Sequence, residues 1–167
     1  MKDLIILAGA PGSGKSTIGE ILREKEGFPL VEFGWLRQGH LDNIWSNTSP
    51  EEEQMARENL LFVLNNYWRH GYKNIVVTDL TEIQVTSLAE TYKEKDYVIT
   101  SLTISNDDEL KKRVLGERDS GFRNVDAALT WNKALRDRPL LKHEYKIDNT
   151  HNDPRETAKA IANLARK

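Results

Sequence analysis

The amino-acid sequence predicts an α/β fold in which helices cover a mainly parallel β-sheet. Short apolar runs alternate with helical patterns along the whole chain, and this alternation is typical of parallel sheets. The first apolar run ends in glycines, as a buried parallel strand does before a tight turn. The chain has 167 residues, which is about the length of one domain. We therefore expect residues 1–167 to form a single domain.

The N-terminal part is expected to contain two strands with a helix between them. Residues 4–8 are uninterruptedly apolar and read as a buried strand. Residues 17–26 carry an apolar stripe at helical spacing, and Gly27 is the expected end of that helix. Residues 28–33 are a second short strand. The following segment, 34–48, has no clear periodicity and is expected to be irregular.

The next helix has a strong start signal. Ser49 offers a capping hydroxyl, Pro50 suits the first helical position, and three glutamates follow at the positive end of the helix dipole. The helix is expected to run to residue 69 or 70, with its buried side drawn from Met55, Leu60, Val63, Leu64 and Tyr67.

The rest of the chain continues the alternation. Asn106 and Asp153 are expected to cap the starts of two helices, because their side chains accept hydrogen bonds from the first backbone N–H groups. The expected elements are, in order, strand 74–79, helix 82–93, strand 97–105, helix 107–118, polar loop 119–124, helix 125–136, strand 145–148 and helix 154–165.

Composition excludes several classes of function. Apolar residues make up 38% of the chain and charged residues 30%, which describes a folded globular protein rather than a disordered one. The net charge of −2 provides no overall basic field for nucleic acid, so any polyanion site has to be local. The chain has no cysteine, which excludes disulfides, thiolate zinc sites and cysteine nucleophiles. Asp3 interrupts the apolar N-terminus, so we expect no secretory leader, no membrane partner and a cytoplasmic location.

The most specific motif lies between the first strand and the first helix. Residues 9–16 read GAPGSGKS and match G-x-x-x-x-G-K-[ST] in full, with the strand and helix context that this phosphate-binding loop requires. Gly12 and Gly14 allow backbone N–H groups to point at phosphate oxygens, and the helix start adds its positive dipole end. The alternative is an ordinary glycine-rich turn before a helix.

Each polar residue of the motif has an expected role in binding a nucleotide. Lys15 supplies a cation for the β- and γ-phosphates, and the Ser16 hydroxyl is the expected Mg²⁺ ligand. Ser13 and Thr17 complete the expected nucleotide site. Asp79 ends a core strand, where a magnesium or substrate carboxylate would lie; the alternative is that it merely terminates the strand.

With these residues the chain resembles the superfamily of P-loop kinases, which includes adenylate-kinase-like and shikimate- or gluconate-kinase-like phosphotransferases. The resemblance implies the P-loop NTPase fold, a three-layer sandwich with a five-stranded parallel sheet in the order 2-3-1-4-5. It also implies an acceptor-binding segment at about residues 34–70 and a helical lid at about residues 113–138.

Further site residues follow from this resemblance. The sequence GWLR at residues 34–37 is similar to the acceptor segment of adenylate kinases and makes Arg37 an acceptor-site residue, although Trp35 departs from the usual acidic residue. Residues 113–118, RVLGER, are similar to the lid entrance, so Arg113 would lie over the adenine and Arg118 would meet ATP phosphates. Asn149 falls in the loop that reads the base.

The charge pattern supports the lid independently. Four arginines fall in or beside a polar loop between two helices: Arg118, Arg123, Arg136 and Arg138. Guanidinium groups suit the oxygens of a transferring phosphoryl group. The alternative is that the arginines pair with neighbouring acids on an exposed face, of which the candidates are Asp119, Asp126 and Asp137.

Two departures from the nucleotide-kinase pattern bear on the acceptor. The segment 79–83, DLTEI, lacks the arginine that holds an acceptor monophosphate, and the segment 131–133, WNK, replaces the paired arginines. We therefore expect a neutral or weakly charged hydroxyl acceptor, with Arg37 as the observation against it. Asp79, Asp42 and Glu32 are the candidate bases, in that order, and the candidate pocket residues are Trp35, His40, Asp42, Trp45 and Trp68.

The sequence therefore predicts an ATP- and Mg²⁺-dependent kinase that phosphorylates a hydroxyl group of a small molecule. Two alternatives stay open: a nucleoside monophosphate kinase with a modified acceptor clamp, and a nucleotide-binding switch or adaptor without transfer activity. A kinase that acts on nucleic-acid ends is a further possibility, but the near-neutral net charge and the absence of a basic stripe outside the lid weigh against it.

Overall fold

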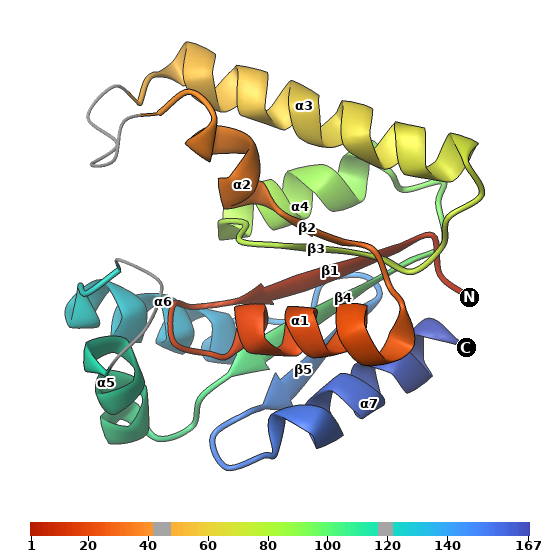
Figure 1. Ribbon diagram of the computed structural model, residues 1–167. Coiled ribbons are helices and arrows are strands. Elements are labelled where there is room, and N and C mark those ends of the chain that lie inside the picture. The colour runs from red at the N-terminus through yellow and green to blue at the C-terminus, as the bar shows by residue number, and fades with distance from the viewer. Residues whose placement is uncertain (42–47, 117–121) are drawn as a thin grey trace.

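The computed structural model describes residues 1–41, 48–116 and 122–167, and it confirms the predicted α/β fold. Its five-stranded sheet is parallel throughout and has the strand order β2-β3-β1-β4-β5, as expected (Figure 1). The strands are β1 (Leu4–Gly9), β2 (Leu30–Glu32), β3 (Ile75–Thr78), β4 (Tyr97–Thr103) and β5 (Glu144–Asp148).

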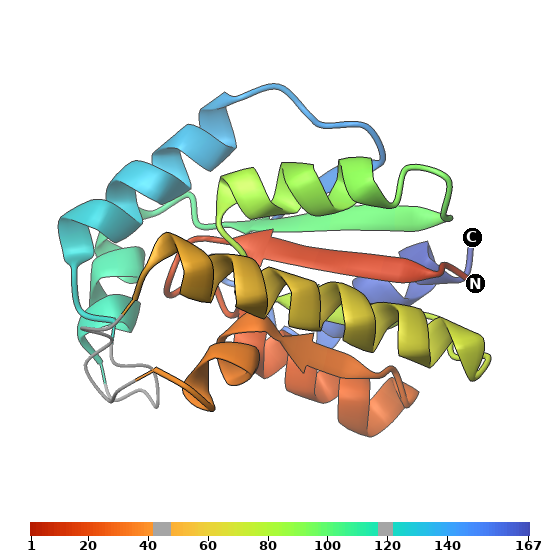
Figure 2. The same ribbon diagram turned by 90° about the horizontal axis from the view of Figure 1, so that it is seen from above.

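Helices form the two outer layers. α3 and α4 cover one face of the sheet and α1 and α7 cover the other, while α5 and α6 lie at the end of the sheet opposite the chain termini (Figure 1). Seen from the α3 side, α3 and α4 lie next to each other over the strands (Figure 2). The helices are α1 (Lys15–Glu26), α2 (Phe33–Gln38), α3 (Pro50–Arg69), α4 (Glu82–Thr91), α5 (Asp107–Leu115), α6 (Val125–Asp137) and α7 (Pro154–Ala165).

The core divides into two clusters because successive side chains of a strand point to opposite faces. Leu4 and Ile6 of β1 belong to the cluster under α3 and α4, and Ile5 and Leu7 belong to the cluster under α1 and α7. All six residues of β1 are buried, which accounts for its uninterrupted apolar sequence. A third, smaller cluster joins α5 to α6.

The predicted caps are present. The Ser49 side chain accepts from the Glu52 N–H, Asn106 caps α5, and Asp153 accepts from the Arg155 N–H. Gly27 ends α1 in the left-handed conformation with φ of 68°.

Two expectations about the acceptor segment were wrong. Residues 33–38 form the short helix α2, because Phe33 is buried against the core and the helix packs on α3. Met55 is 39% exposed, and Ala56 instead takes a buried position of α3 with Leu60 and Leu64.

The register of the strands determines which end of the sheet carries the candidate site. Glu32 pairs with Thr78, and Ile6 pairs with Val77, so the carboxyl ends of β1, β2 and β3 meet at one edge of the sheet. The phosphate-binding motif, Glu32 and Asp79 therefore lie at the same edge, where ligands bind in open parallel sheets. Within the described residues, no helix has the length and apolar character needed to cross a membrane.

Candidate active site

The glycine-rich motif forms a loop from β1 into α1, and side chains from distant elements hold its shape. Gly14 has φ of 99°, and a Cβ there would lie 2.8 Å from Asn149 Nδ2. The same Asn149 amide donates to the Ser13 carbonyl at 2.8 Å, and Ser13 is buried. The loop is thus shaped for backbone N–H groups to face a ligand, as the motif requires.

Lys15 begins α1 and bends back over the loop. Its Nζ donates to the carbonyls of Gly9 at 2.8 Å and Ala10 at 3.1 Å. An ammonium group on a flexible stem can exchange such carbonyls for phosphate oxygens, which suits the expected role of Lys15. Thr17 is exposed in the first turn of the same helix.

Two carboxylates face the start of α1. Glu32 accepts a hydrogen bond from the Ser16 hydroxyl; burial first, and then the charges of Asp79 and Glu20, raise the pKa of Glu32. The pKa of Asp79 is also raised, chiefly by burial, although Lys15, the Gly34 N–H and Arg37 oppose that rise. The structure thus brings Lys15, Ser16, Glu32 and Asp79 into one cluster.

Asp79 is held in an unusual backbone conformation. Its φ is 64°, in the left-handed region that non-glycine residues rarely occupy. A Cβ on Gly34 would lie 2.5 Å from Asp79 Oδ2, so only glycine at position 34 lets the carboxylate approach the N-terminus of α2 this closely. Backbone strain of this kind concentrates at functional sites.

The donor set of the cluster fits magnesium. Hydroxyl and carboxylate oxygens are the ligands that Mg²⁺ prefers, and Mg²⁺ usually takes only one or two of them together with water and substrate phosphates. Ser16, Glu32 and Asp79 supply such oxygens. Across residues 1–41, 48–116 and 122–167, no group of three or more His, Cys, Asp or Glu is arranged to hold a metal ion by itself.

Arg37 and His40 lie beside this cluster and contact acids of α3. Arg37 of α2 forms an ion pair with Glu53, and its charge also acts on Asp79. His40 Nε2 lies 2.7 Å from a Glu52 oxygen. Both acids stand in the first turn of α3, where the sequence had indicated only a favourable contact with the helix dipole.

The predicted aromatic pocket is only partly supported. Trp35 is 45% exposed on α2, next to Gly34, and is available to a ligand. Trp68 lies elsewhere: its Nε1 donates to the Asp3 carbonyl at 3.1 Å, and its ring packs against Tyr92. The pocket role of Trp68 was therefore wrong, because the side chain is used in packing near the N-terminus. Asp42 and Trp45 lie outside the described residues.

Arg113 and Asn149 meet on the other side of the loop. The Arg113 guanidinium donates to the carbonyls of Asn149 at 3.1 Å and Thr150 at 2.6 Å, and its Nε donates to Glu109 at 2.8 Å. The Asn149 side chain holds the phosphate-binding loop, and its backbone O binds Arg113. These two residues are thus brought together beside Gly12, where an added Cβ would contact α5.

The arginines assigned to the lid differ in their positions and contacts. Arg118 lies outside the described residues. Arg123 is exposed and donates to the Phe122 carbonyl at 3.2 Å. Arg136 donates to the Ile104 and Ser105 carbonyls, which attaches the second half of the expected lid segment to the end of β4.

Asn132 adds to this attachment. Its amide donates to the Ile104 carbonyl at 2.8 Å and accepts from the Ile104 N–H at 2.9 Å, and the side chain is fully buried. The position where nucleotide kinases carry an arginine is thus used here to fix α6 to the sheet. A closing movement of all of residues 113–138 would have to break these bonds.

The sequence undervalued three acids. The sequence ranks Glu32 only third among the candidate bases, and it indicates Glu52 and Glu53 only as favourable charges at the start of a helix. Glu32 ends a core strand as Asp79 does, and this shared position is the available signal. The pairs that Glu52 and Glu53 form depend on the packing of α2 against α3, which no local sequence pattern indicates.

The comparisons with known proteins agree with this fold. A sequence family described as the AAA domain matches residues 5–129. A candidate kinase from Chloroflexus aurantiacus j-10-fl has a TM-score of 0.66 at 17% identity, over 96% of this chain and 97% of that chain. A sugar kinase from Janibacter sp. HTCC2649 has a TM-score of 0.65 at 16% identity, over 99% and 96% of the two chains.

A gluconokinase from Sinorhizobium meliloti 1021 is similar as well, with a TM-score of 0.58 at 21% identity, over 97% of this chain and 91% of that chain. Among curated proteins, no sequence matches this chain significantly. The family match spans well over half of the chain and includes the whole phosphate-binding loop. The chain therefore belongs to the AAA domain family, and its fold is that of the P-loop kinases.

Proposed function

We propose that the protein is an ATP- and Mg²⁺-dependent kinase that transfers the γ-phosphoryl group to a hydroxyl group of a small molecule. The observation that carries this proposal is the cluster of Lys15 and Ser16 with the carboxylates of Glu32 and Asp79 at one edge of the sheet. A site that only bound the magnesium complex of a nucleotide would need the loop and one carboxylate for the metal, which leaves the second carboxylate for an acceptor.

The two sides of the loop suggest where each substrate binds. In-line transfer requires the acceptor oxygen and the leaving oxygen to lie on opposite sides of the transferring group. Glu32 and Asp79 mark one side of the loop, and Arg113 with Asn149 marks the other. We assign the acceptor to the first side and the nucleoside of ATP to the second.

The residues of the chain have distinct roles in this proposal. Lys15 leaves the loop carbonyls to bind the β- and γ-phosphates, and loop N–H groups hold the phosphate chain. Mg²⁺, held by Ser16 and a neighbouring carboxylate, would offset charge that develops on the phosphate oxygens. Arg118 and Arg123 are the proposed cations of the lid.

Glu32 or Asp79 is the proposed base for the acceptor hydroxyl. A carboxylate whose pKa is raised lies closer to the pH at which it works and is therefore a stronger base. The carboxylate that does not act as base would bind magnesium or a second acceptor hydroxyl.

The test is ATP consumption with Mg²⁺ in the presence of nucleosides, nucleoside monophosphates, sugars, sugar acids and amino sugars. We expect ADP formation above the acceptor-free rate with one class of hydroxyl compound, and a phosphorylated product of matching mass. If no class stimulates turnover although ATP binds, the protein is a nucleotide-binding switch or adaptor instead.

A nucleoside monophosphate kinase is the second candidate, and Arg37 favours it because this arginine lies beside Asp79 on the acceptor side. The clamp is otherwise incomplete, because Asn132 is buried against β4 where a phosphate-binding arginine would be needed. Transfer to AMP, CMP, UMP, GMP or dTMP at rates above those with sugars would support this candidate.

A further inference from the structure

We propose that Glu53 makes the acceptor site select against anions, so that the acceptor is a hydroxyl compound that carries an amino group or no charge. This inference rests on the proposed kinase function and names the charge class of its acceptor. It starts from Arg37, the cation on the acceptor side that could bind a phosphate or carboxylate.

Arg37 is engaged by acids on both sides. Its guanidinium forms an ion pair with Glu53 from the first turn of α3, and its charge also acts on Asp79 at the end of β3. The Arg37 side chain is 18% exposed and that of Glu53 is 34% exposed, so solvent screens this pair less than it screens a surface pair. One positive charge therefore faces two negative charges.

The remaining charges on this side increase the acidic excess. Glu32 lies close enough to Asp79 for the two carboxylates to repel each other, which contributes to the raised pKa of Glu32. Glu52 stands next to Glu53 and contacts His40. Lys15 is assigned to the phosphates of ATP. The acceptor side thus presents several carboxylates with Arg37 as its fixed cation among the described residues.

A bound nucleotide does not reverse this balance. MgATP carries a net negative charge at neutral pH, and the cations assigned to it, which are Lys15 and the proposed lid arginines Arg118 and Arg123, are used at its phosphates. An anionic acceptor would still approach the negative side chains of the acceptor side. An ammonium group on the acceptor would be attracted by the same charges, as expected for electrostatic complementarity.

An anion that bound Arg37 through the donors facing Glu53 would have to displace this carboxylate. Displacement would leave the Glu53 carboxylate without its guanidinium partner in a partly buried position, which is costly. Glu53 therefore acts as a specificity determinant: it reduces the capacity of Arg37 to bind an anion without touching the reacting atoms.

The first experiment compares three acceptors that share one carbon skeleton and differ in charge: D-gluconate, D-glucitol and D-glucamine. With the wild-type protein we expect kcat/KM to be highest for the amine and lowest for the carboxylate, with about a tenfold difference or more between these two. The proposal is overturned if D-gluconate is the best acceptor of the three.

Variants then assign the effect to Glu53. In Glu53→Gln the ratio of kcat/KM for D-gluconate to that for D-glucitol should rise about tenfold, because Arg37 loses this charged partner and the site loses one negative charge. Glu51→Gln is the matched control, because Glu51 lies in the same turn and is exposed. The substitution removes the same charge from the start of the helix. An equal shift in both variants would mean that only overall charge matters and would overturn the role of Glu53.

A binding measurement separates this inference from the kinase function. With saturating Mg²⁺ and a non-hydrolysable ATP analogue in the phosphate-binding loop, sulfate is titrated calorimetrically into the wild-type protein, Glu53→Gln and Glu51→Gln. Sulfate should bind at least about tenfold more tightly to Glu53→Gln than to the other two proteins. Equal affinities would overturn the inference whether or not any acceptor is phosphorylated, whereas absence of transfer to all acceptor classes would overturn only the kinase function.

Discussion

The Lys15 ammonium group binds carbonyls of its own loop and is expected to bind phosphate oxygens instead when a nucleotide is present. This group donates to two carbonyls of the loop in a part-buried position, so removing it takes away these hydrogen bonds but no side chain of the hydrophobic core. We expect Lys15→Ala to abolish phosphoryl transfer while changing the free energy of unfolding by no more than about 1 kcal/mol.

Kinase assays and urea denaturation of Lys15→Ala check this expectation. Lys25→Ala is a suitable control, because Lys25 is a lysine in the last turn of the same helix, away from the loop. Full activity of Lys15→Ala would show that the loop does not act on a transferring phosphate.

Gly34 is a second position where a single added carbon atom is expected to change the rate of transfer. A Cβ there would come within 2.5 Å of Asp79 Oδ2, so Gly34→Ala should push the carboxylate out of place and lower kcat/KM at least about tenfold. Gly39→Ala is the matched control: among the described residues, no heavy atom beyond the chain neighbours lies within 4 Å of the added methyl group, and Gly39 has φ of −71°, which alanine adopts readily. Equal activity of both variants would mean that the position of Asp79 is irrelevant to transfer.

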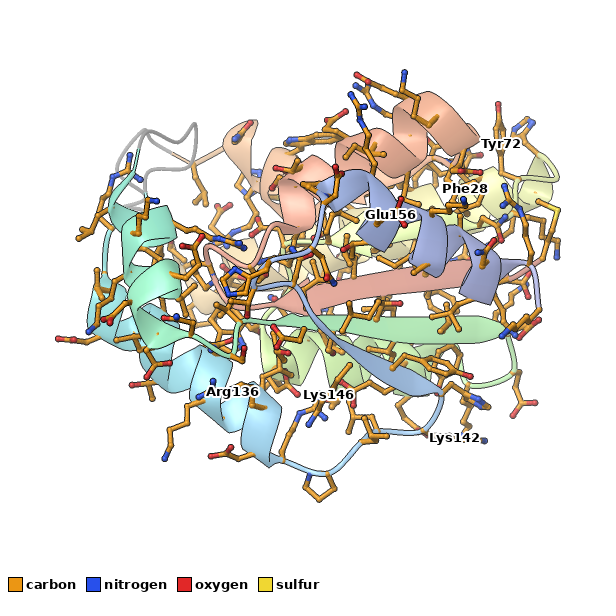
Figure 3. All side chains as sticks on the ribbon, turned by 90° about the horizontal axis from the view of Figure 1, so that it is seen from below. Phe28, Tyr72, Arg136, Lys142, Lys146 and Glu156 are labelled. Carbon is orange, nitrogen blue, oxygen red and sulfur yellow. The ribbon has the colours of Figure 1, made fainter. Side chains whose placement is uncertain are left out.

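At the scale of elements, Arg138 and Glu144 join α6, β5 and α4. Arg138 donates to both oxygens of the buried Glu144, at 2.7 and 2.8 Å, and also pairs with Glu82 at the start of α4. Lys146 donates to the Arg136 carbonyl nearby, where α6 meets β5 (Figure 3). This junction fixes the end of α6 to β5 at the edge of the sheet and to the start of α4.

The junction predicts a dependence of stability on pH. Burial alone would raise the pKa of Glu144, but hydrogen bonds from Arg138, the Leu141 N–H and Ser101, together with the Arg138 charge, hold it below its ordinary value of 4.5. An acid with a lowered pKa stabilises the fold above its unfolded-state pKa, and this stabilisation is lost as the pH falls through the folded-state pKa.

Urea denaturation at a series of acidic pH values tests whether stability falls as the pH falls. The wild-type protein should lose stability as the pH falls below 4.5, and the loss should be smaller in Glu144→Gln, which should already be less stable at neutral pH. Asp137→Asn, which removes the exposed pair with Lys133, should leave the pH profile of the wild type unchanged. A Glu144→Gln profile parallel to that of the wild type would contradict the proposed role of this carboxylate.

The same elements show what the sequence could predict and what it could not. Strands, caps and the phosphate-binding loop were predicted because each depends on neighbours within a few residues, as at Ser49 and Gly27. The helix α2 was missed because six residues are too few for a periodic pattern, and its formation depends on Phe33 packing into the core. The pairs Ser16–Glu32 and Arg37–Glu53 join different elements, so no local pattern could reveal them.

At the scale of the whole molecule, Asn149 joins distant parts of the chain around the phosphate site. Its Nδ2 donates to Ser13 in the loop, its Oδ1 accepts from Thr157 of α7, its N–H donates to Thr103 of β4, and its carbonyl accepts from Arg113 of α5. The resemblance to known kinases had indicated only a role near the base. The side chain instead links the shape of the loop to the packing of the C-terminal helix.

This link predicts that nucleotide binding and global stability change together. Asn149→Ala leaves the buried Thr157 hydroxyl and the Ser13 carbonyl without their partner, which should lower the free energy of unfolding by about 1–3 kcal/mol. It should also loosen the loop, so that the rise in Tm produced by MgATP is smaller than in the wild type. Thermal denaturation with and without MgATP measures both effects.

Asn152→Ala is the control for this measurement, because Asn152 is an exposed asparagine of the same segment whose amide donates only within it, to the Asp148 carbonyl at 2.8 Å. Its effects on unfolding and on the rise in Tm with MgATP should both be small. If Asn149→Ala lost stability but kept the full rise in Tm, the loop would hold its shape without Asn149, and the contact would serve folding alone. If Asn149→Ala lowered both the free energy of unfolding and the rise in Tm with MgATP, the C-terminal third of the chain would help to build the nucleotide site formed near its N-terminus.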